Sequence, residues 1–367
     1  MTVTPVVDSH VYCFGSPAAD QMPGQQVWHA LHHQPAWRIR DRAPSDARRL
    51  LDPTPGDPLR LATDVDFRTD PVHRRFVWTV DGEDVTKQIY PPDLADLAYG
   101  PASCVAKMDY AGIDWGLIHV DRVLGQDPAY LADCVRRYPD RLRSMAPVDE
   151  PAIRGETERV ARDLEAAIRV HGLHAIKFIP EYAYRSGARD WLDGPFRTFW
   201  DVASTLGVPV FLTLGAAPGH DDEQAGYRAE LGNVRRFMAR YPKLDVSLTH
   251  GFPWRAFLDG DGLTLPDWLW EPFGEPRLHL EVSFAVRLGD IFEYPFREVW
   301  PTLEALLRHI GADRLLWGSD MPFQDRFCTY RQSHEWLDRT GLLDDAALAA
   351  IKGGTAARLL GVAASVA

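Results

Sequence analysis

The feature that most constrains the fold is a regular succession of short apolar runs, each followed by a helical stretch. Seven of these runs begin near residues 115, 142, 173, 209, 244, 278 and 314, so successive starts lie 27, 31, 36, 35, 34 and 36 residues apart. This interval is the length of one β-strand, one helix and their connections. Several runs are nearly continuously apolar, which is typical of parallel strands that are covered on both faces.

One further run near the N-terminus brings the number of predicted strands to eight. Eight strand–helix units predict an α/β fold, a (β/α)8 TIM barrel. A doubly wound open sheet has the same local rhythm and is the structural alternative. No GxGxxG sequence follows the first strand, which argues against the dinucleotide-binding form of that alternative. The predicted strands are residues 4–11, 115–120, 142–148, 173–179, 209–214, 244–249, 278–283 and 314–318.

The rhythm is broken once, between the first and second predicted strands. Residues 13–100, which are 88 residues, form an insertion, and residues 1–12 and 101–367 are then a single barrel domain. Subtracting 88 from 367 leaves 279 residues, close to the ~250 of one barrel. Within the insertion, the apolar run 76–80 followed by Asp81-Gly82 predicts a β-hairpin. Because the segment is rich in Trp and Arg, we expect it to form a lid over the barrel mouth.

The amino-acid composition argues against some classes of binding partner. The chain has 40 basic and 52 acidic residues, a net charge of −12, which argues against nucleic acid or an anionic membrane as the main partner. No apolar run approaches the ~18 residues of a membrane helix, and the first residues have no signal-peptide pattern. The four cysteines are scattered without a CxxC pair, as expected of free thiols in a reducing cytoplasm. We therefore expect a cytoplasmic enzyme with a small-molecule substrate.

Polar residues gather where the predicted strands end. In a TIM barrel the carboxyl ends of the strands carry the active site, and a ring of His, Asp, Glu and Lys there exceeds what turns alone require. We therefore expect these side chains to converge on one site. The candidates, in chain order, are His10, Tyr12, Lys177, Thr213, His250, Glu281 and Asp320.

Three strand motifs resemble the amidohydrolase-related family, in the branch of the amidohydrolase superfamily that contains aminocarboxymuconate semialdehyde decarboxylase. They are VVDSHVY at 6–12, VSLTHG at 246–251 and LLWGSDMP at 315–322. Segments 108–114, 135–141 and 355–360 are also similar to that family. The resemblance covers residues 1–12 and 101–362 and leaves the insertion without a counterpart.

The resemblance implies a divalent metal, commonly zinc, at the barrel mouth. Family members hold it with an HxH pair on strand one, a histidine ending strand five and an aspartate ending strand eight. By position His10 is the first ligand, Asp320 is the aspartate, and His250 is the catalytic histidine, which in the family is a proton-transfer group or a substrate contact. Tyr12 and Thr213 stand where the other two histidines are expected, and a threonine hydroxyl is a poor zinc ligand.

Three alternatives follow from this altered ligand set. A metal is held by His10, Asp320, Glu281 and water; or the enzyme is metal-free, with Asp320 as general base and His250 orienting water; or the barrel only binds a ligand. The leading hypothesis is a hydrolase that attacks a carbonyl of a small cyclic or aromatic substrate through water activated by Asp320. The runner-up is a nonoxidative decarboxylase of an aromatic or unsaturated carboxylic acid.

Further cations are candidates for contacts with the substrate. Lys177 is either a buried partner of Asp149 or Glu150 or a cation for an anionic substrate. In the insertion, Arg38 and Arg40 are candidates for binding a carboxylate. We expect Tyr12 and Thr213 to line the same pocket. A homodimer is implied by the family resemblance alone.

Overall fold

The computed structural model describes residues 4–363, which fall into two compact units. Unit 1 contains the residues up to Tyr12, Val105–Val120 and the chain from Asp127 onward. Unit 2 contains Cys13–Cys104 and Asp121–Gln126.

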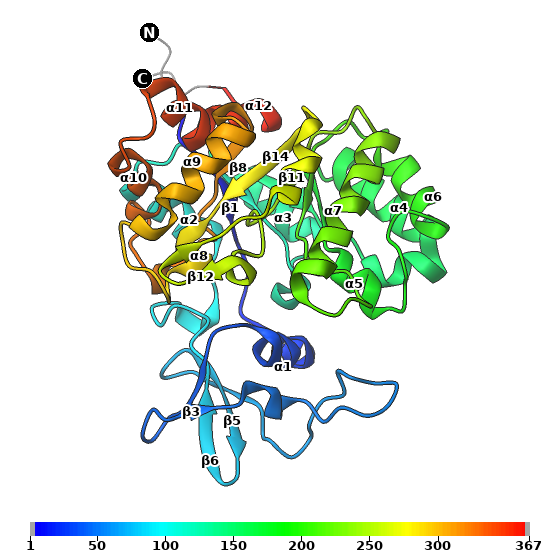
Figure 1. Cartoon of the computed structure of the whole chain (residues 1–367). Coiled ribbons are helices and arrows are strands. Elements are labelled where there is room, and N and C mark those ends of the chain that lie inside the picture. Colours follow the sequence, from blue (N-terminus) through cyan, green and yellow to red (C-terminus); the bar gives the residue numbers. More distant parts are fainter. Residues whose placement is uncertain (1–3, 364–367) are drawn as a thin grey trace. The chain divides into compact units, whose positions relative to one another are not determined.

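Unit 1 is built on eight strands joined in parallel in their chain order, several of which are labelled in Figure 1. Every residue of seven of these strands is buried, as expected for a sheet with both faces covered. The eight predicted strands are all present, each trimmed by a few residues at its ends. They are β1 (Val7–Val11), β7 (Trp115–Ile118), β8 (Leu142–Ala146), β9 (Ala175–Phe178), β10 (Val210–Leu212), β11 (Val246–Leu248), β14 (Leu278–Val282) and β15 (Leu315–Trp317).

The first and last strands meet and close the sheet into a barrel. Val11 forms a parallel bridge with Met321, and the Tyr12 amide donates to the Met321 carbonyl at 2.8 Å. The Asp320 amide donates to the His10 carbonyl at 2.8 Å, and the Ser9 hydroxyl donates to the Trp317 carbonyl at 2.8 Å. The predicted (β/α)8 barrel is therefore confirmed, and the open-sheet alternative is excluded.

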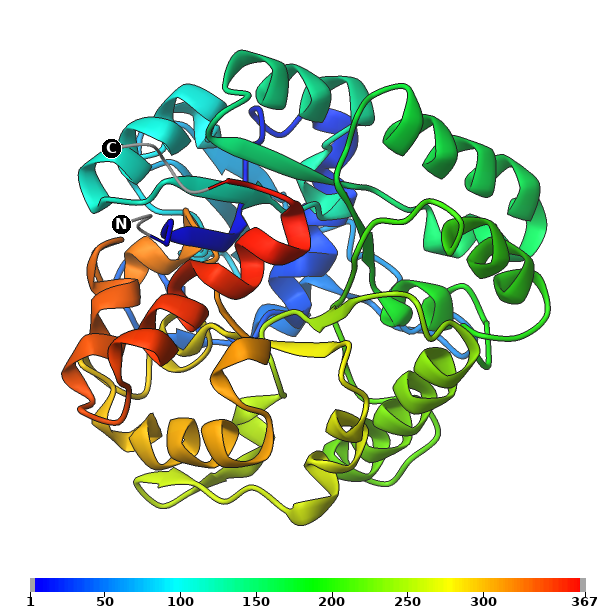
Figure 2. The ribbon, with the colours of Figure 1, turned by 90° about the horizontal axis from the view of Figure 1, so that it is seen from above.

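Helices surround the strands of unit 1 (Figure 2). Their starts carry ordinary capping signals: the Asp127 carboxylate accepts from the Tyr130 amide at 2.7 Å, just before Pro128, and Asp222 accepts from the Ala225 amide at 2.7 Å. The helices outside the insertion are α2 (Pro101–Ala111), α3 (Pro128–Arg137), α4 (Ile153–Arg169), α5 (Pro180–Arg185), α6 (Pro195–Ala203), α7 (Glu223–Arg240), α8 (Phe284–Leu288), α9 (Trp300–His309), α10 (Gln332–Arg339), α11 (Asp345–Ala349) and α12 (Thr355–Leu360). A small hairpin, β12 (Leu258–Asp259) and β13 (Gly262–Leu263), follows β11.

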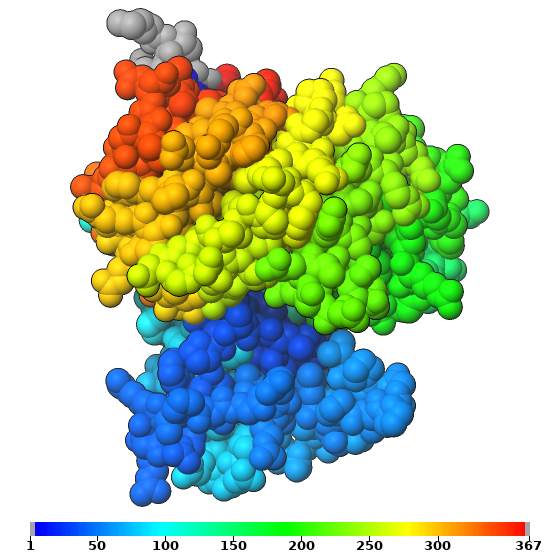
Figure 3. Space-filling view, in the orientation of Figure 1, coloured from blue at the N-terminus to red at the C-terminus, as the bar shows by residue number. Residues whose placement is uncertain are grey.

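Unit 2 has a fold and a core of its own, and its atoms run from blue to cyan in Figure 3. One helix, α1 (Met22–Leu31), accompanies an antiparallel sheet with the strand order β3-β2-β6-β5-β4. Trp78, Leu50 and Val85 are buried in its core. The strands are β2 (Ala36–Arg38), β3 (Pro44–Ser45), β4 (Arg68–Asp70), β5 (Arg75–Val80) and β6 (Glu83–Thr86).

The hairpin predicted at residues 76–80 is confirmed by β5 and β6. Val80 pairs with Glu83, so Asp81 and Gly82 form the two-residue turn. Their φ angles are 53° and 79°, the left-handed values that such a turn requires and that Asp-Gly accommodates. Across residues 4–363, no helix combines the length and the apolar character needed to cross a bilayer.

Candidate active site

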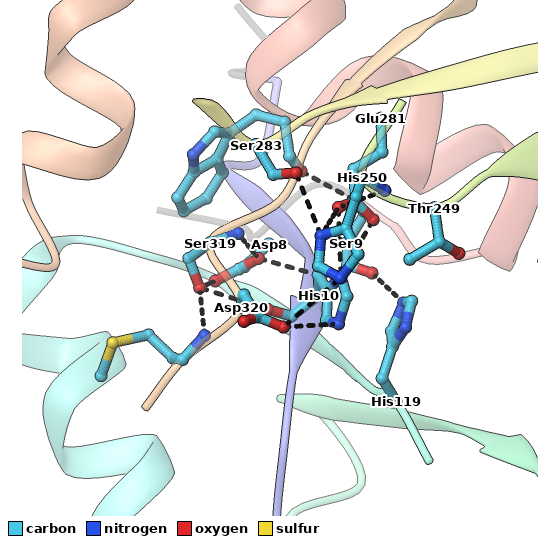
Figure 4. Close-up of polar contacts among 12 residues, drawn as sticks. Asp8, Ser9, His10, His119, Thr249, His250, Glu281, Ser283, Ser319 and Asp320 are labelled. Atoms are coloured by element: carbon cyan, nitrogen blue, oxygen red, sulfur yellow. Dashed lines mark hydrogen bonds and ion pairs between the residues drawn. The ribbon is translucent and has the colours of Figure 1, made fainter. Parts of the chain in front are cut away.

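The centre of the site is His10 on β1, whose side chain is fully buried between two carboxylates (Figure 4). Its Nδ1 lies 3.0 and 3.1 Å from the two carboxylate oxygens of Glu281 on β14. Its Nε2 lies 3.0 Å from Asp320 Oδ1 and 3.0 Å from the Tyr12 hydroxyl. Residues from the first, seventh and eighth barrel strands therefore meet at one imidazole ring.

The two carboxylates determine the protonation of His10. Burial alone would lower the pKa of His10, but the charges of Glu281 and Asp320 outweigh it and raise the pKa to about 9. With no cation bound, the ring is therefore an imidazolium that donates one N–H to each carboxylate.

His250 follows β11 and occupies the other side of the cluster. Its Nδ1 lies 3.2 Å from the Ser283 hydroxyl and 3.5 Å from Glu281 Oε1, and its Nε2 lies 3.8 Å from Asp320 Oδ1. Burial and then the positive charge of His10 lower the pKa of His250 well below its usual value. His250 is therefore a neutral imidazole, the form that accepts a proton or binds a metal.

Both predicted catalytic residues have a left-handed backbone. The φ angle is 64° at His250 and 67° at Asp320, values that are uncommon for residues other than glycine. Each such residue costs about 1–3 kcal/mol, and functional sites are where this strain is usually found. The His250 conformation is held by its own amide, which donates to Glu281 Oε1 at 3.1 Å, and by Trp254, which donates to the His250 carbonyl at 2.7 Å.

Asp8 ties together the two strands that carry His10 and Asp320. One oxygen of its carboxylate accepts from the amides of His10 and Ser319, each at 2.9 Å. The other accepts from the Ser319 hydroxyl and from the Tyr330 hydroxyl at 2.6 Å. Burial raises the pKa of Asp8 to about 6, although these hydrogen bonds act in the opposite direction.

A glycine makes room for the cluster. A Cβ atom on Gly318 would lie 2.7 Å from Glu281 Cδ and 2.9 Å from His10 Cβ, closer than such atoms approach in proteins. The glycine that precedes Ser319 and Asp320 thus allows His10 and Glu281 to meet.

The donor set fits a divalent cation. His10, His250 and Glu281 each offer a ligand atom, and these atoms lie within 4.8 Å of one another. Asp320 Oδ1, next to both histidines, is a fourth donor. Two imidazoles with carboxylates are ligands that zinc and related ions accept. The structure therefore brings together the three ligands predicted from sequence, His10, Asp320 and Glu281, and adds His250.

The two positions that depart from the family pattern differ from each other. Tyr12 reaches the cluster through its contact with His10 Nε2. The Thr213 hydroxyl, after β10, is buried, and no described residue satisfies its hydrogen bonds. Thr213 thus leaves an unsatisfied polar atom at the position where the family resemblance predicts a ligand.

Lys177 on β9 contacts the cluster through a third histidine, His119. Its Nζ lies 3.1 Å from His119 Nδ1 and 3.3 Å from the Thr249 hydroxyl. The other nitrogen of His119 donates to the Ser9 carbonyl at 2.8 Å, and its ring stacks on His10 with the centroids 3.5 Å apart. Burial, followed by the charges of His10 and Lys177, keeps the pKa of His119 well below its usual value, so it is neutral.

The alternative partners predicted for Lys177 have other contacts. Asp149 forms an ion pair with Arg159 at 3.0 Å, and Glu150 accepts from the Ile179 amide at 2.9 Å. The role of Lys177 toward a substrate stays a prediction.

The two arginines predicted from the insertion belong to unit 2. Arg38 forms ion pairs with Asp41 at 2.9 Å and with Glu83 at 3.2 Å, and its side chain is partly exposed. Arg40 lies just after β2. Their role in substrate binding, like the lid role of residues 13–100, stays a prediction.

The sequence reasoning assigned no role to His119, Ser283 or Asp8, which all contact the cluster. His119 and Asp8 do stand at predicted strand ends, as the other candidates do, but strand-end position alone gave neither of them an individual role. Two arginines beyond the strand ends, Arg287 and Arg326, were also missed, because they lie in short helices that the strand rhythm does not mark.

Solved structures share this fold at low sequence identity. 5-Carboxyvanillate decarboxylase from Sphingomonas paucimobilis is 15% identical with a TM-score of 0.53, and the match covers 98% of this chain and 99% of that one. 2,6-Dihydroxybenzoate decarboxylase from Rhizobium is 18% identical with a TM-score of 0.51, covering 71% and 87%. A protein described as a 2-pyrone-4,6-dicarboxylic acid hydrolase, from Pseudomonas putida, is 18% identical with a TM-score of 0.52, covering 72% and 88%.

No curated protein matches the chain. The amidohydrolase family model matches residues 84–362, which contain His250, Glu281 and Asp320 but not His10. Because this match spans most of the sequence, the chain belongs to the amidohydrolase family.

Proposed function

We propose that this chain is an enzyme that removes a carboxylate, without an oxidant, from a small aromatic or unsaturated carboxylic acid. The observation that carries the proposal is the cluster at the barrel end, where Asp320 lies 3.0 Å from protonated His10 and 3.8 Å from neutral His250. The extent of the match with 5-carboxyvanillate decarboxylase, which includes the residues of the insertion, gives further support. Of the two reactions considered from sequence, decarboxylation is thus preferred to hydrolysis.

In this reaction the proton stored on His10 passes to Asp320, 3.0 Å away, and from Asp320 to the carbon that bears the carboxylate. The carbon–carbon bond then breaks, its electron pair returns to the ring or double bond, and CO₂ leaves. Each turnover consumes one proton, which solvent restores to His10. Asp320 needs both neighbours for this role, because His10 stores a proton and neutral His250 can accept one.

A divalent cation fits the same residues, with His10, His250, Glu281 and Asp320 as its ligands. When bound, such an ion supplies Lewis acidity that polarises an oxygen of the substrate.

Hydrolysis is the second candidate, and the neutral state of His250 favours it specifically. A neutral imidazole close to Asp320 can orient or deprotonate water for attack on a carbonyl. The fold shared with the pyrone dicarboxylic acid hydrolase is compatible with this reaction. A barrel that only binds a ligand is the third possibility, and it needs no proton transfer by Asp320.

One experiment separates these possibilities. The purified chain is incubated in D₂O with 2,6-dihydroxybenzoate, 5-carboxyvanillate and 2-pyrone-4,6-dicarboxylate, with CO₂ and products quantified by mass spectrometry. A decarboxylase releases CO₂ and places one deuterium at the vacated carbon, whereas a hydrolase opens the pyrone ring without releasing CO₂. Asp320→Asn should abolish turnover, and Asp133→Asn, an exposed aspartate of α3, should not. Full turnover by Asp320→Asn would refute the assignment of Asp320, and binding without turnover would favour the ligand-binding barrel.

A further inference from the structure

Two arginines lie next to the catalytic cluster but take no part in it. Arg287 lies in α8, which begins directly after Ser283, the residue that contacts His250. Arg326 ends the short 3-10 helix Phe323–Arg326, whose first amide donates to the Asp320 carbonyl at 2.8 Å. Both therefore belong to the loops that leave the carboxyl ends of β14 and β15.

The two loops pack on each other. A Cβ atom on Gly289, just after α8, would lie 2.6 Å from the Cβ of Phe327, the residue after Arg326. The two guanidinium groups are thus carried by adjacent backbone segments at the barrel end that holds Asp320.

Neither guanidinium has a carboxylate partner. Among residues 4–363, no acidic group lies within 4.0 Å of either one, and Arg287 Nε and Arg326 Nη1 are buried without a hydrogen-bond partner. Asp290, the acidic residue near Arg287, is already paired with Arg255. Arg326 satisfies only its Nε, which donates to the Phe323 carbonyl at 2.7 Å, and its guanidinium lies 4.8 Å from the Phe327 ring.

Such an arrangement is costly without a ligand. Burial lowers the pKa of Arg326 to about 10 and also lowers that of Arg287, and Asp320 is the first group that acts in the opposite direction on each. Desolvated guanidinium groups with open donors normally pair with carboxylate or phosphate, which matches their planar geometry. Asp320 does not fill this role, because its Oδ1 is held by His10.

We infer that Arg287 and Arg326 bind a carboxylate of the substrate, and that this carboxylate is the one retained in the product. The inference rests on the proposed function. A departing carboxylate loses its negative charge on the way to CO₂, so two arginines on that group would stabilise the substrate more than the transition state and slow the reaction. A retained carboxylate keeps its charge throughout, and binding it orients the ring toward Asp320. The substrate class is therefore an aromatic or unsaturated dicarboxylic acid that loses one of its two carboxylates.

The test measures the affinity of the protein for three probes by titration calorimetry. The probes are isophthalate with two carboxylates, benzoate with one, and neutral isophthalamide, which has the shape of isophthalate. Wild-type protein should bind isophthalate more tightly than the other two. Arg287→Gln and Arg326→Gln should each weaken isophthalate binding about 10- to 100-fold, the loss expected for a hydrogen bond to a charged group. Isophthalamide binding should change little. Arg358→Gln, at an exposed arginine of α12 that donates to the Asp313 carbonyl, is the matched control and should have no effect.

A purely structural role makes the opposite prediction for stability. Because the guanidinium groups are unpaired, the Gln variants should keep or raise the melting temperature, whereas a structural arginine would lower it. Arg287→Lys and Arg326→Lys, which keep the charge without the planar fork, should recover part of the affinity. Equal binding of isophthalate and isophthalamide by the wild type, or equal losses for both in the Gln variants, would overturn the inference. If arginine-dependent isophthalate binding is found but no dicarboxylate releases CO₂, the proposed reaction fails and the carboxylate site stands.

Discussion

His29 in α1 offers a sharp test of the physical chemistry of unit 2. Its side chain is fully buried, neither ring nitrogen has a hydrogen-bond partner among the described residues, and Phe67, Phe76 and Trp78 surround it. Burial, followed by the charge of Lys87, lowers the pKa of His29 from 6.5 to about 3. The folded state thus holds this histidine neutral.

The size of the effect follows from this shift. Between pH 6.5 and about 3 the unfolded chain binds a proton at His29 and the folded chain does not, so the stabilisation present above pH 6.5 is lost as the pH falls. From pH 7 to pH 5 the free energy of unfolding should decrease by about 2 kcal/mol because of His29 alone. His29→Phe should remove this part of the pH dependence. At pH 7 the same substitution should also raise the free energy of unfolding by roughly 1–3 kcal/mol, because it removes buried ring nitrogens that have no hydrogen bond.

The measurement is urea-induced unfolding at pH 7 and pH 5. Hydrogen exchange is monitored in peptides from residues 22–90, so that the unfolding curve reports on unit 2. His29→Leu, with a smaller side chain than Phe, separates the loss of titration from any crowding of the core. Val72→Ala, at an exposed apolar residue of the same unit, is the control and should keep the wild-type pH dependence. The reasoning is wrong if His29→Phe and His29→Leu lose as much stability between pH 7 and pH 5 as the wild type does.

Three further predictions concern the site. Asp320→Asn should lower kcat at least about 100-fold, the low end for the loss of a general acid or base, and wild-type CO₂ release from the mutant would contradict this. Elemental analysis should find less than one zinc per chain after purification and one after addition of zinc, because Thr213 replaces an expected ligand; one tightly held zinc from the start would contradict it. Gly318→Ala should reduce both zinc uptake and turnover, since its methyl group collides with Glu281 and His10; normal zinc uptake and turnover by a folded variant would count against that contact.

The order of the strands could be predicted from the sequence because it depends on local pattern. Each strand of the barrel is a short apolar run at a regular interval. A strand that is buried on both faces consists almost entirely of apolar residues, so it can be recognised in the sequence. The hairpin of unit 2 was predictable for a similar reason, since Asp81-Gly82 is one of few dipeptides that suit its turn. Boundaries were less certain, and the predicted strands were several residues too long.

The geometry of the site depended on contacts between residues far apart in the chain. His10 and Glu281 are 271 positions apart, and only closure of the barrel makes them neighbours. The sequence indicated His10, Glu281 and Asp320 as candidates, but their distances and the protonation of His10 depend on tertiary structure.

The sequence by itself therefore determined the barrel, the end of it that carries the site, and most of the residues there, because strand periodicity and strand-end position are local properties. Only the tertiary structure decided that His10 is held between two carboxylates, that His250 is neutral, and that Arg287 Nε and Arg326 Nη1 are buried without a hydrogen-bond partner among the described residues. These properties arise from desolvation and from charges brought close by the fold, and neither can be read from the order of residues.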